Sequence, residues 1–211
     1  MAEVVTRGIG EHEVIADQAE LRVAFAAEAA DRSGAVNLLS ERTAAVNALL
    51  ERAPVAAAVQ VRHRSMSTGD RWDRKRRVGA SAHLELVLQT TELGMLADLV
   101  AELVSAEPMR LDGPHWSLAD HASAMDEALR RAVADARSRA EAYAAAAGLR
   151  LGPLLRLGDE GGAERPYPFG GEYRMAAAAG AVSGDAITVL GLNPMPITVR
   201  ATCTASWSLL D

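Results

Sequence analysis

The spacing of apolar residues along this chain switches repeatedly between two and about 3.6, and each switch marks a change of secondary structure. Alternation predicts a strand at the start of the chain and further strands over 17–27, 55–61, 78–88, 115–118, 149–157 and 197–209. Helical spacing predicts helices over 31–52, 91–107 and 120–147. The order strand-strand-helix-strand-strand-helix-strand-helix-strand-strand predicts an α+β fold, with an antiparallel sheet packed by three helices. We expect one domain over 1–211.

The predicted helices have recognisable ends and apolar stripes. The N-caps are expected at Asp31 or Ser33, at Thr91 and at Asp120, and Gly148 stands where a helix C-cap favours positive φ. The first helix is expected to bury Val36, Leu38, Leu39, Val46, Leu49 and Leu50. The third is expected to bury Met125, Leu129, Ala132, Val133, Ala136, Ala140, Tyr143 and Ala147. The pairs Asp135 with Arg139 and Arg137 with Glu141 then belong to its solvated face.

Charge and cysteine content limit the classes of protein to which the chain can belong. A net charge of −6 argues against coating nucleic acid or an anionic membrane with the whole surface. We read no secretory signal, and no stretch is long and apolar enough to span a bilayer. The single cysteine, Cys203, has no partner for an internal disulfide and is expected to be buried in the last strand. These features predict a cytoplasmic protein.

One segment concentrates positive charge. Residues 62–77 hold seven basic and two acidic residues, which is +5, so the rest of the chain carries −11 to reach −6. We expect this segment to form the tip of a hairpin between the strands over 55–61 and 78–88. Three interpretations are open: a solvated tip that discourages edge pairing, a subunit contact with an acidic surface, or a site for nucleic acid or phosphate. The candidate anion- or partner-binding residues are Arg62, Arg64, Arg71, Trp72, Arg74, Lys75, Arg76 and Arg77.

A second candidate region is the stretch over 158–184, which is rich in Gly, Pro and Ala and lacks periodicity. It is expected to be a long loop that acts as an oligomer contact, is simply mobile, or closes over the pocket of an enzyme. Tyr167 and Phe169, flanked by prolines and glycines, are the candidate oligomer contacts.

The chain shows no constellation typical of catalysis. The sequence Gly8-Ile9-Gly10 begins like a dinucleotide fingerprint but lacks the third glycine and the following helix, so a turn or bulge between strands is expected there. The five histidines have no metal-ligand spacing. No nucleophile motif or lysine-containing phosphate loop appears. We therefore predict no catalytic residue, no metal and no cofactor.

Four stretches resemble the SIMPL-domain family, whose members are largely of unknown function. They are GIGEHEVIADQAELRVAFAAEA from Gly8, GASAHLELVLQTTELGMLADLV from Gly79, GPHWSLAD from Gly113, and DEALRRAVADARSRAEAYAAAAGLRLG from Asp126. The last is the most specific, because the family's long helix is rich in alanine and arginine and ends at a glycine. This chain departs from the family's pattern at Ala16, where a proline is usual, and at Trp116, where phenylalanine is usual.

The resemblance implies an α+β fold, self-association in some relatives and no established catalytic residues. Many bacterial relatives are periplasmic, and animal members are described as adaptors associated with a signalling kinase. We expect a non-enzymatic, self-associating binding or scaffold protein, so a homo-oligomer whose other protein partners are unidentified. An anion- or nucleic-acid-binding module using residues 62–77 is the first alternative, although nucleic acid is not the partner we favour. An enzyme with a pocket under 158–184 is the second.

Overall fold

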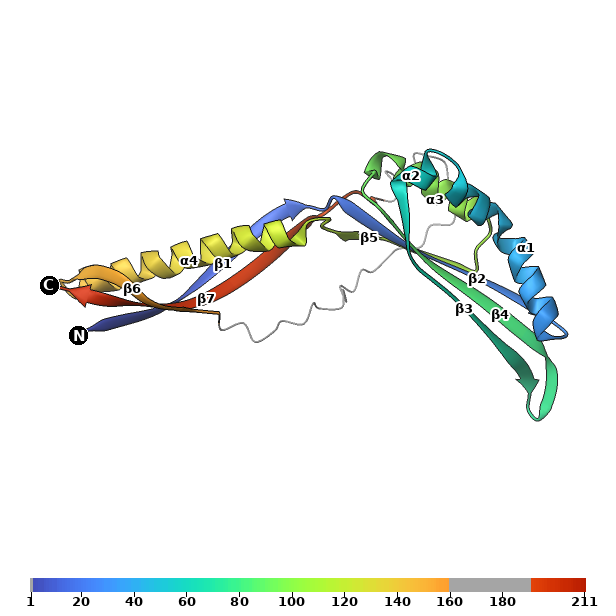
Figure 1. The fold of residues 1–211 in the computed structure, drawn as a ribbon, viewed down its shortest axis with the longest axis horizontal. Coiled ribbons are helices and arrows are strands. Elements are labelled where there is room, and N and C mark those ends of the chain that lie inside the picture. The colour runs from blue at the N-terminus through green and yellow to red at the C-terminus, as the bar shows by residue number, and fades with distance from the viewer. Residues whose placement is uncertain (1, 160–190) are drawn as a thin grey trace. The chain divides into compact units, whose positions relative to one another are not determined.

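The computed structural model describes residues 2–159 and 191–211. Its elements, in chain order, are β1 (Glu3–Ile15), β2 (Gln18–Ala29), α1 (Arg32–Glu51), α2 (Val55–Ala58), β3 (Val59–Asp73), β4 (Arg76–Thr90), the 3-10 turn η1 (Leu93–Met95), α3 (Leu96–Ser105), β5 (Arg110–Ser117), α4 (His121–Ala146), β6 (Arg150–Gly158) and β7 (Pro196–Leu210) (Figure 1). The predicted α+β class and the order of the principal elements are confirmed. The short helix α2 and the turn η1 are additions to that order.

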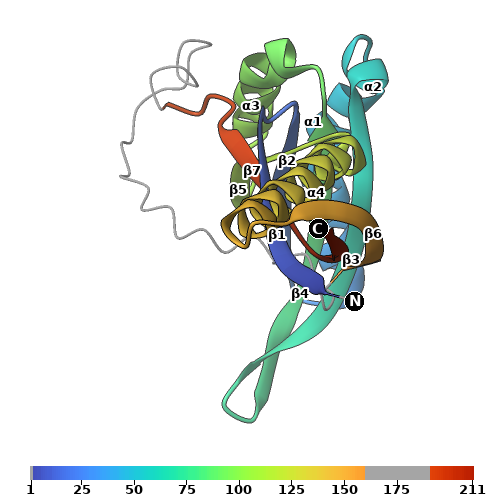
Figure 2. The same ribbon diagram turned by 90° about the vertical axis from the view of Figure 1, so that its left-hand side faces the viewer.

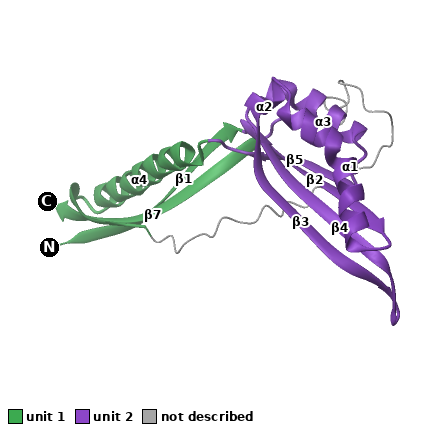
Figure 3. Cartoon of the chain, turned by 45° about the vertical axis from the view of Figure 1, so that its right-hand side comes forward, with its two compact units in different colours: residues 1–15, 120–178, 196–211 green, residues 16–119, 179–195 purple. Residues whose placement is uncertain are grey.

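The chain folds into two compact units, each with its own antiparallel sheet (Figure 3). Unit 1 contains β1, α4, β6 and β7, and unit 2 contains the elements from β2 to β5. The strands are thus divided between two sheets. The assignment of 1–211 to one domain stays a prediction.

Unit 1 is a three-stranded sheet in the order β1-β7-β6, with α4 packed along β1 and β7 (Figure 2). The helix buries an unbroken row of alanines at every fourth position: Ala124, Ala128, Ala132, Ala136, Ala140 and Ala144. Gly8 and Gly10 of β1 face this row. A Cβ atom built on Gly8 would lie 1.9 Å from the carbonyl oxygen of Ala132, and one on Gly10 would lie 2.0 Å from that of Ala128. The backbones of helix and strand therefore lie in direct contact.

This contact corrects two predictions. The expected stripe of α4 was wrong in its large members, because Leu129 is 37% exposed and Tyr143 is 64% exposed. Helix and glycine-containing strand are too close for anything larger than alanine between them. The expected turn or bulge at Gly8–Gly10 was also wrong, since both glycines lie inside regular β1, paired in register with β7.

The ends of α4 are as predicted. The Asp120 side chain accepts a hydrogen bond of 2.9 Å from the Ser123 amide, as an N-cap does. Gly148 has a φ of +72°, and the Leu149 amide donates to the Ala144 carbonyl at 2.9 Å. This positive-φ ending turns the chain into β6. In β7 the predicted apolar face is confirmed, and Cys203 on it is buried.

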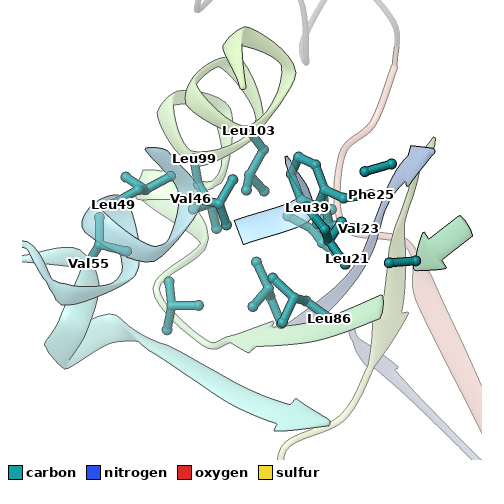
Figure 4. Close-up of a cluster of buried hydrophobic side chains, with 14 of the residues drawn as sticks. Leu21, Val23, Phe25, Leu39, Val46, Leu49, Val55, Leu86, Leu99 and Leu103 are labelled. Atoms are coloured by element: carbon teal, nitrogen blue, oxygen red, sulfur yellow. The ribbon is translucent and has the colours of Figure 1, made fainter. Parts of the chain in front are cut away.

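Unit 2 is a four-stranded sheet in the order β3-β4-β2-β5, with α1 and α3 on one face. The alternation predicted for the second strand is confirmed, because Leu21, Val23 and Phe25 are each at most 2% exposed. They pack against the helices in one apolar core (Figure 4), whose members include Leu39, Val46, Leu49, Val55, Leu86, Leu99 and Leu103. Trp116 of β5 is only partly buried and packs at the margin of this core.

Three local predictions in unit 2 needed correction. Residues 55–58 form the helical turn α2, because the Pro54 carbonyl accepts from the Ala57 and Ala58 amides, so β3, the first strand of the hairpin, begins only at Val59. In α1, capped by Asp31 as predicted, the buried row is Ala35, Leu39, Thr43, Val46 and Leu49. Leu38 is 36% exposed, whereas Ala35 and Thr43, which were not in the predicted stripe, are buried.

The cap expected at Thr91 was wrong. The hydroxyl of Thr90 accepts the Glu92 amide at 3.0 Å and donates to the Ala58 carbonyl at 2.9 Å. The chain then makes the 3-10 turn η1, and α3 begins at Leu96 without a side-chain cap. The apolar stripe of α3 is confirmed, with Leu96, Leu99 and Leu103 buried.

Candidate interaction site

The basic segment lies on a long hairpin formed by β3 and β4. The two strands pair from Val59 opposite Thr90 to Asp73 opposite Arg76, and Arg74, with φ of 54°, and Lys75 make the turn. Figure 1 and Figure 2 both show the hairpin extending past α1. The predicted hairpin is confirmed, but most of the expected tip is strand, because β3 continues to Asp73.

Several of the basic side chains are engaged within the unit. Arg71 forms an ion pair with Glu28 of β2. Asp70 receives two arginines: Arg77 at 3.2 Å and Arg32, at the start of α1, at 2.9 Å. Arg64 donates to the Asn47 side chain at 3.3 Å. These contacts connect the hairpin to α1 and β2. Their arginines are therefore already engaged within the unit.

The cations at the turn are unpaired. Within the described residues, no ion pair or side-chain hydrogen bond is made by Arg74, Lys75 and Arg76, or by Arg62 near the start of β3. Residues 73–76 carry three cations and one carboxylate, a net of +2. Trp72, opposite Arg77, is 61% exposed, and Val78 is 50% exposed. The structure therefore joins free positive charge to exposed apolar surface at the hairpin tip.

The outer edge of β3 is the second feature of this hairpin. All but three of the 15 residues of β3 are exposed. Among the described residues, the backbone hydrogen bonds of this strand are its pairing with β4 and, at its first residue, the bond from the Val59 amide to the Val55 carbonyl. Alternate residues of an antiparallel strand direct both backbone groups to the same side, so about seven residues of β3 present unpaired N–H and C=O groups.

The other described sheet edges are protected. In β1, the Ile9 amide donates to Asp135 at 3.0 Å and the Glu11 carbonyl accepts from Arg131 at 2.8 Å, so α4 covers that edge. In β6 the edge contains Pro153 and its pairing has two register shifts. In β5 the edge contains Pro114 and one shift. Strand β3 has no proline, and its two shifts lie near its ends, outside His63–Arg71.

Sequence reasoning missed this edge. The available signal was the absence of proline between Pro54 and Pro108, which permits a long strand. The alternation in 59–73 is weak because the strand is exposed, so periodicity did not reveal where β3 ended. The partners of Asp70 and Arg71 also depend on tertiary contacts across as many as 43 residues, counted from Glu28 to Arg71.

Two hollows of the described surface are small and open. The larger, of about 210 Å³, lies between α1 and α3 and is lined by Ala45, Leu49, Glu102, Ser105 and Ala106. Its carboxylate, Glu102, is paired with Arg52. The smaller, of about 50 Å³, is lined by Gln18, Ala58, Gln60, Gln89, Thr90 and Thr91. The larger is lined by one titratable side chain, Glu102, and the smaller by none.

The groups with shifted pKa lie on α4 and beneath it. Hydrogen bonds from Arg130 and then Arg131 lower the pKa of Glu127. The amide of Ile9, followed by Arg139, lowers the pKa of Asp135. Burial raises the pKa of the Cys203 thiol. Each shift comes from a contact that holds α4 or from the helix–sheet core, so these groups define a structural network.

Three further features were considered in the sequence: metal ligands, membrane-spanning helices and the loop over 158–184. Among the described residues, no three His, Cys, Asp or Glu side chains gather as metal ligands. In the same part of the chain no helix is long and apolar enough to cross a membrane. The loop predicted over 158–184, with Tyr167 and Phe169, lies outside the described residues except for its first two positions.

Taken with the geometry, these observations define an α+β protein of two helix-covered antiparallel sheets, with a basic hairpin as its candidate interaction site. Residues 4–207 match the family model SIMPL, described as a protein of unknown function (DUF541). The chain therefore belongs to the SIMPL family. No curated protein matches it.

Proposed function

We propose that this protein is a non-enzymatic, self-associating binding or scaffold protein that uses the β3–β4 hairpin for assembly. The observation that carries the proposal is the hairpin tip, where Arg74, Lys75 and Arg76 have no partner in the described residues while Trp72 is 61% exposed. The remainder of the chain is strongly acidic. A basic apolar tip on an acidic molecule favours contacts between copies, because opposite surfaces attract and the tryptophan supplies area to bury.

The non-enzymatic part of the proposal is supported by how the ionisable groups are used. Glu127, Asp135 and Glu102 each pair with an arginine on an exposed helix surface. The thiol of Cys203 faces the helix–sheet interface of unit 1 and is only 4% exposed. These groups hold secondary structure together, and the hairpin is left as the feature without an internal role at its tip.

The test is the solution mass, measured by light scattering at low and high salt. The variant changes Arg74, Lys75 and Arg76 to Glu and leaves Arg77 intact, because Arg77 is bonded to Asp70. The control reverses three exposed cations of unit 1, Arg7, Arg156 and Arg200, which gives the same change in net charge and also breaks the 3.6 Å ion pair of Arg200 with Glu11. We expect a salt-sensitive oligomer that dissociates in the hairpin variant and persists in the control. A monomer in the unchanged chain at low salt, over a wide concentration range, contradicts the proposal.

A second candidate function is the binding of an anion or nucleic acid by the same tip. Its specific support is the position of Trp72 among cations, since an exposed ring can stack on a base while Arg and Lys contact phosphates. The measurement is the quenching of tryptophan fluorescence by single-stranded oligonucleotide over a range of salt. Binding that weakens steeply with salt and disappears in the triple Glu variant would favour this function over assembly.

We also propose a cytoplasmic location. Its support is that Cys203 is buried and has no cysteine with which to pair, so the fold gains nothing from an oxidising compartment. Cell fractionation with the full chain tests it, and recovery from the periplasmic fraction contradicts it.

A further inference from the structure

The outer edge of β3 is the one long edge of the described sheets that is neither interrupted by proline nor covered by a helix. Edge strands in soluble proteins are usually shortened, interrupted by proline or covered, because a free edge pairs with other chains. Here β1 is covered by α4, and β5 and β6 contain proline. Strand β3 remains regular from His63 to Arg71. An unprotected edge of this length is suited to continue its sheet into another molecule.

We propose that β3 pairs antiparallel with β3 of a second copy of this chain, centred on Met66, so that two four-stranded sheets join into one. The inference rests on the proposed self-association and names its interface. Met66 is the midpoint of the strand, since 59 and 73 average to 66, and regular pairing about it spans His63 to Gly69, as far as the register shift at Arg62. The two copies are then related by a two-fold axis, which makes the contact closed and self-complementary.

The charges of β3 select the antiparallel arrangement. About Met66, the regular part of the strand places Arg64 opposite Thr68, so the two copies of this arginine do not face each other. In a parallel pairing in register, Arg64 faces its own copy across the interface. Like charges directly opposite each other destabilise a strand pair. The arginine that disfavours the parallel pairing is therefore compatible with the antiparallel one.

The charges at the two ends of the hairpin give the same preference. Its tip, residues 73–76, carries three cations and one carboxylate, a net of +2. At its base, Val59 pairs with Thr90, and Glu92 lies two residues after Thr90. Antiparallel pairing places each basic tip beside the base of the other copy, where Glu92 lies. It separates the two tips by 14 residues, roughly 46 Å at about 3.3 Å per residue, well beyond the screening length of about 8 Å.

The apolar surface of β3 is consistent with such a contact. Met66 is 58% exposed and Val61 is 42% exposed, and both lie on the face that α1 covers only in part. Opposite residues in an antiparallel pair have Cβ atoms about 4.5–5.5 Å apart, so the two copies of Met66 come into contact and lose exposed area.

Single cysteines test this arrangement by disulfide cross-linking of the full chain under mild oxidation. Met66→Cys should form a covalent dimer at least about tenfold faster than the matched variant Met109→Cys, whose methionine is 63% exposed but lies outside β3. Trp72→Cys should stay at the level of Met109→Cys when oxidised alone. A mixture of His63→Cys and Gly69→Cys should give a heterodimer, because residues 63 and 69 face each other across the pair and a side chain at Gly69 meets nothing within 4 Å. The unchanged chain, with Cys203 buried, should give none.

Each outcome separates the two proposals. If Trp72→Cys dimerises as fast as Met66→Cys, or if Met66→Cys is no faster than Met109→Cys, antiparallel β3 pairing is overturned. Light scattering on the unchanged chain is read independently: an oligomer without the Met66 cross-link retains self-association and rejects the β3 interface, and a monomer rejects both. A second measurement avoids substitution altogether. Amide hydrogen exchange over His63–Arg71 should slow as protein concentration rises, and concentration-independent exchange there overturns the inference.

Discussion

Replacing either glycine of β1 by alanine should separate α4 from its sheet. A Cβ at Gly10 would lie 2.0 Å from the Ala128 carbonyl oxygen and 2.4 Å from the Ala132 amide nitrogen, and a Cβ at Gly8 would lie 1.9 Å from the Ala132 oxygen. These are backbone atoms of a helix, so no rotamer change relieves the overlap. The helix must move away by about 1.5 Å to restore ordinary contact of about 3.5 Å.

The cost follows from what that movement disturbs. Overpacking in a well-packed core costs about 1 to 3 kcal/mol. The displaced helix also loosens the row of buried alanines and the hydrogen bonds that Thr6 and Ile9 make with it, at 2.7 Å and 3.0 Å. We therefore expect Gly8→Ala and Gly10→Ala each to lower the free energy of unfolding by about 3 kcal/mol. Adding Ala136→Gly to Gly8→Ala should rescue little, because the nearest atom belongs to the backbone of Ala132.

Urea denaturation followed by circular dichroism measures this effect. The matched control is Gly94→Ala, where a Cβ meets nothing within 4 Å and φ is ordinary. That substitution should change stability by less than about 1 kcal/mol, in the stabilising direction, because alanine restricts the unfolded chain. Midpoints for Gly8→Ala and Gly10→Ala equal to that of the unchanged chain would show that helix and strand are not in backbone contact.

Three further substitutions test other parts of the fold. Phe25→Ala, at a position 2% exposed, should lower the free energy of unfolding by about 3 to 5 kcal/mol, measured by urea denaturation. Trp116→Ala should lower it by about 2 kcal/mol, because the Trp116 ring is only partly buried. A larger loss of stability at Trp116 would contradict the observed burial. Arg137→Ala should cost under about 0.5 kcal/mol by thermal melting, since its pair with Glu141 is exposed, and a loss above 1.5 kcal/mol would refute that. Asp135→Asn should cost about 0.5 to 1 kcal/mol at pH 7. The pKa of Asp135 is lowered in the folded state, so its carboxylate stabilises the fold above about pH 4, and this stability is lost as the pH falls through the folded pKa. The difference in stability between Asp135→Asn and the unchanged chain should therefore shrink at pH 3. A difference that stays constant with pH would show that the ionised carboxylate is not its cause.

Sequence periodicity predicted the elements that bury one face against large side chains. The alternation around Leu21, Val23 and Phe25 identified β2, and the cap residues Asp31 and Asp120 identified the starts of two helices. These signals are local, since a strand or a helix start is specified by neighbouring residues. They were sufficient for the α+β class and for the order of the principal elements.

The errors arose where distant residues decide the outcome. In α4 a hydrophobicity pattern favours Leu129 and Tyr143 over alanine, and only the glycines of β1, more than a hundred residues earlier, make alanine the residue that fits. The basic segment was recognised as a hairpin, yet which arginines are free depends on Asp70, Glu28 and Asn47. The open edge of β3 could not be predicted because edge or centre is a property of the whole sheet.

The strand order of unit 1 determines when this unit can form during synthesis. Its central strand, β7, is the last element of the chain, and its neighbours β1 and β6 do not pair with each other. The elements from β2 to β5 are contiguous between residues 18 and 117, so they emerge from the ribosome together and can fold early. Strand β1 is synthesised first, but its partner β7 begins at Pro196, which is 181 residues after Ile15 at the end of β1. Until then β1 has no partner strand in its sheet, so closure of unit 1 should be the slow step of folding.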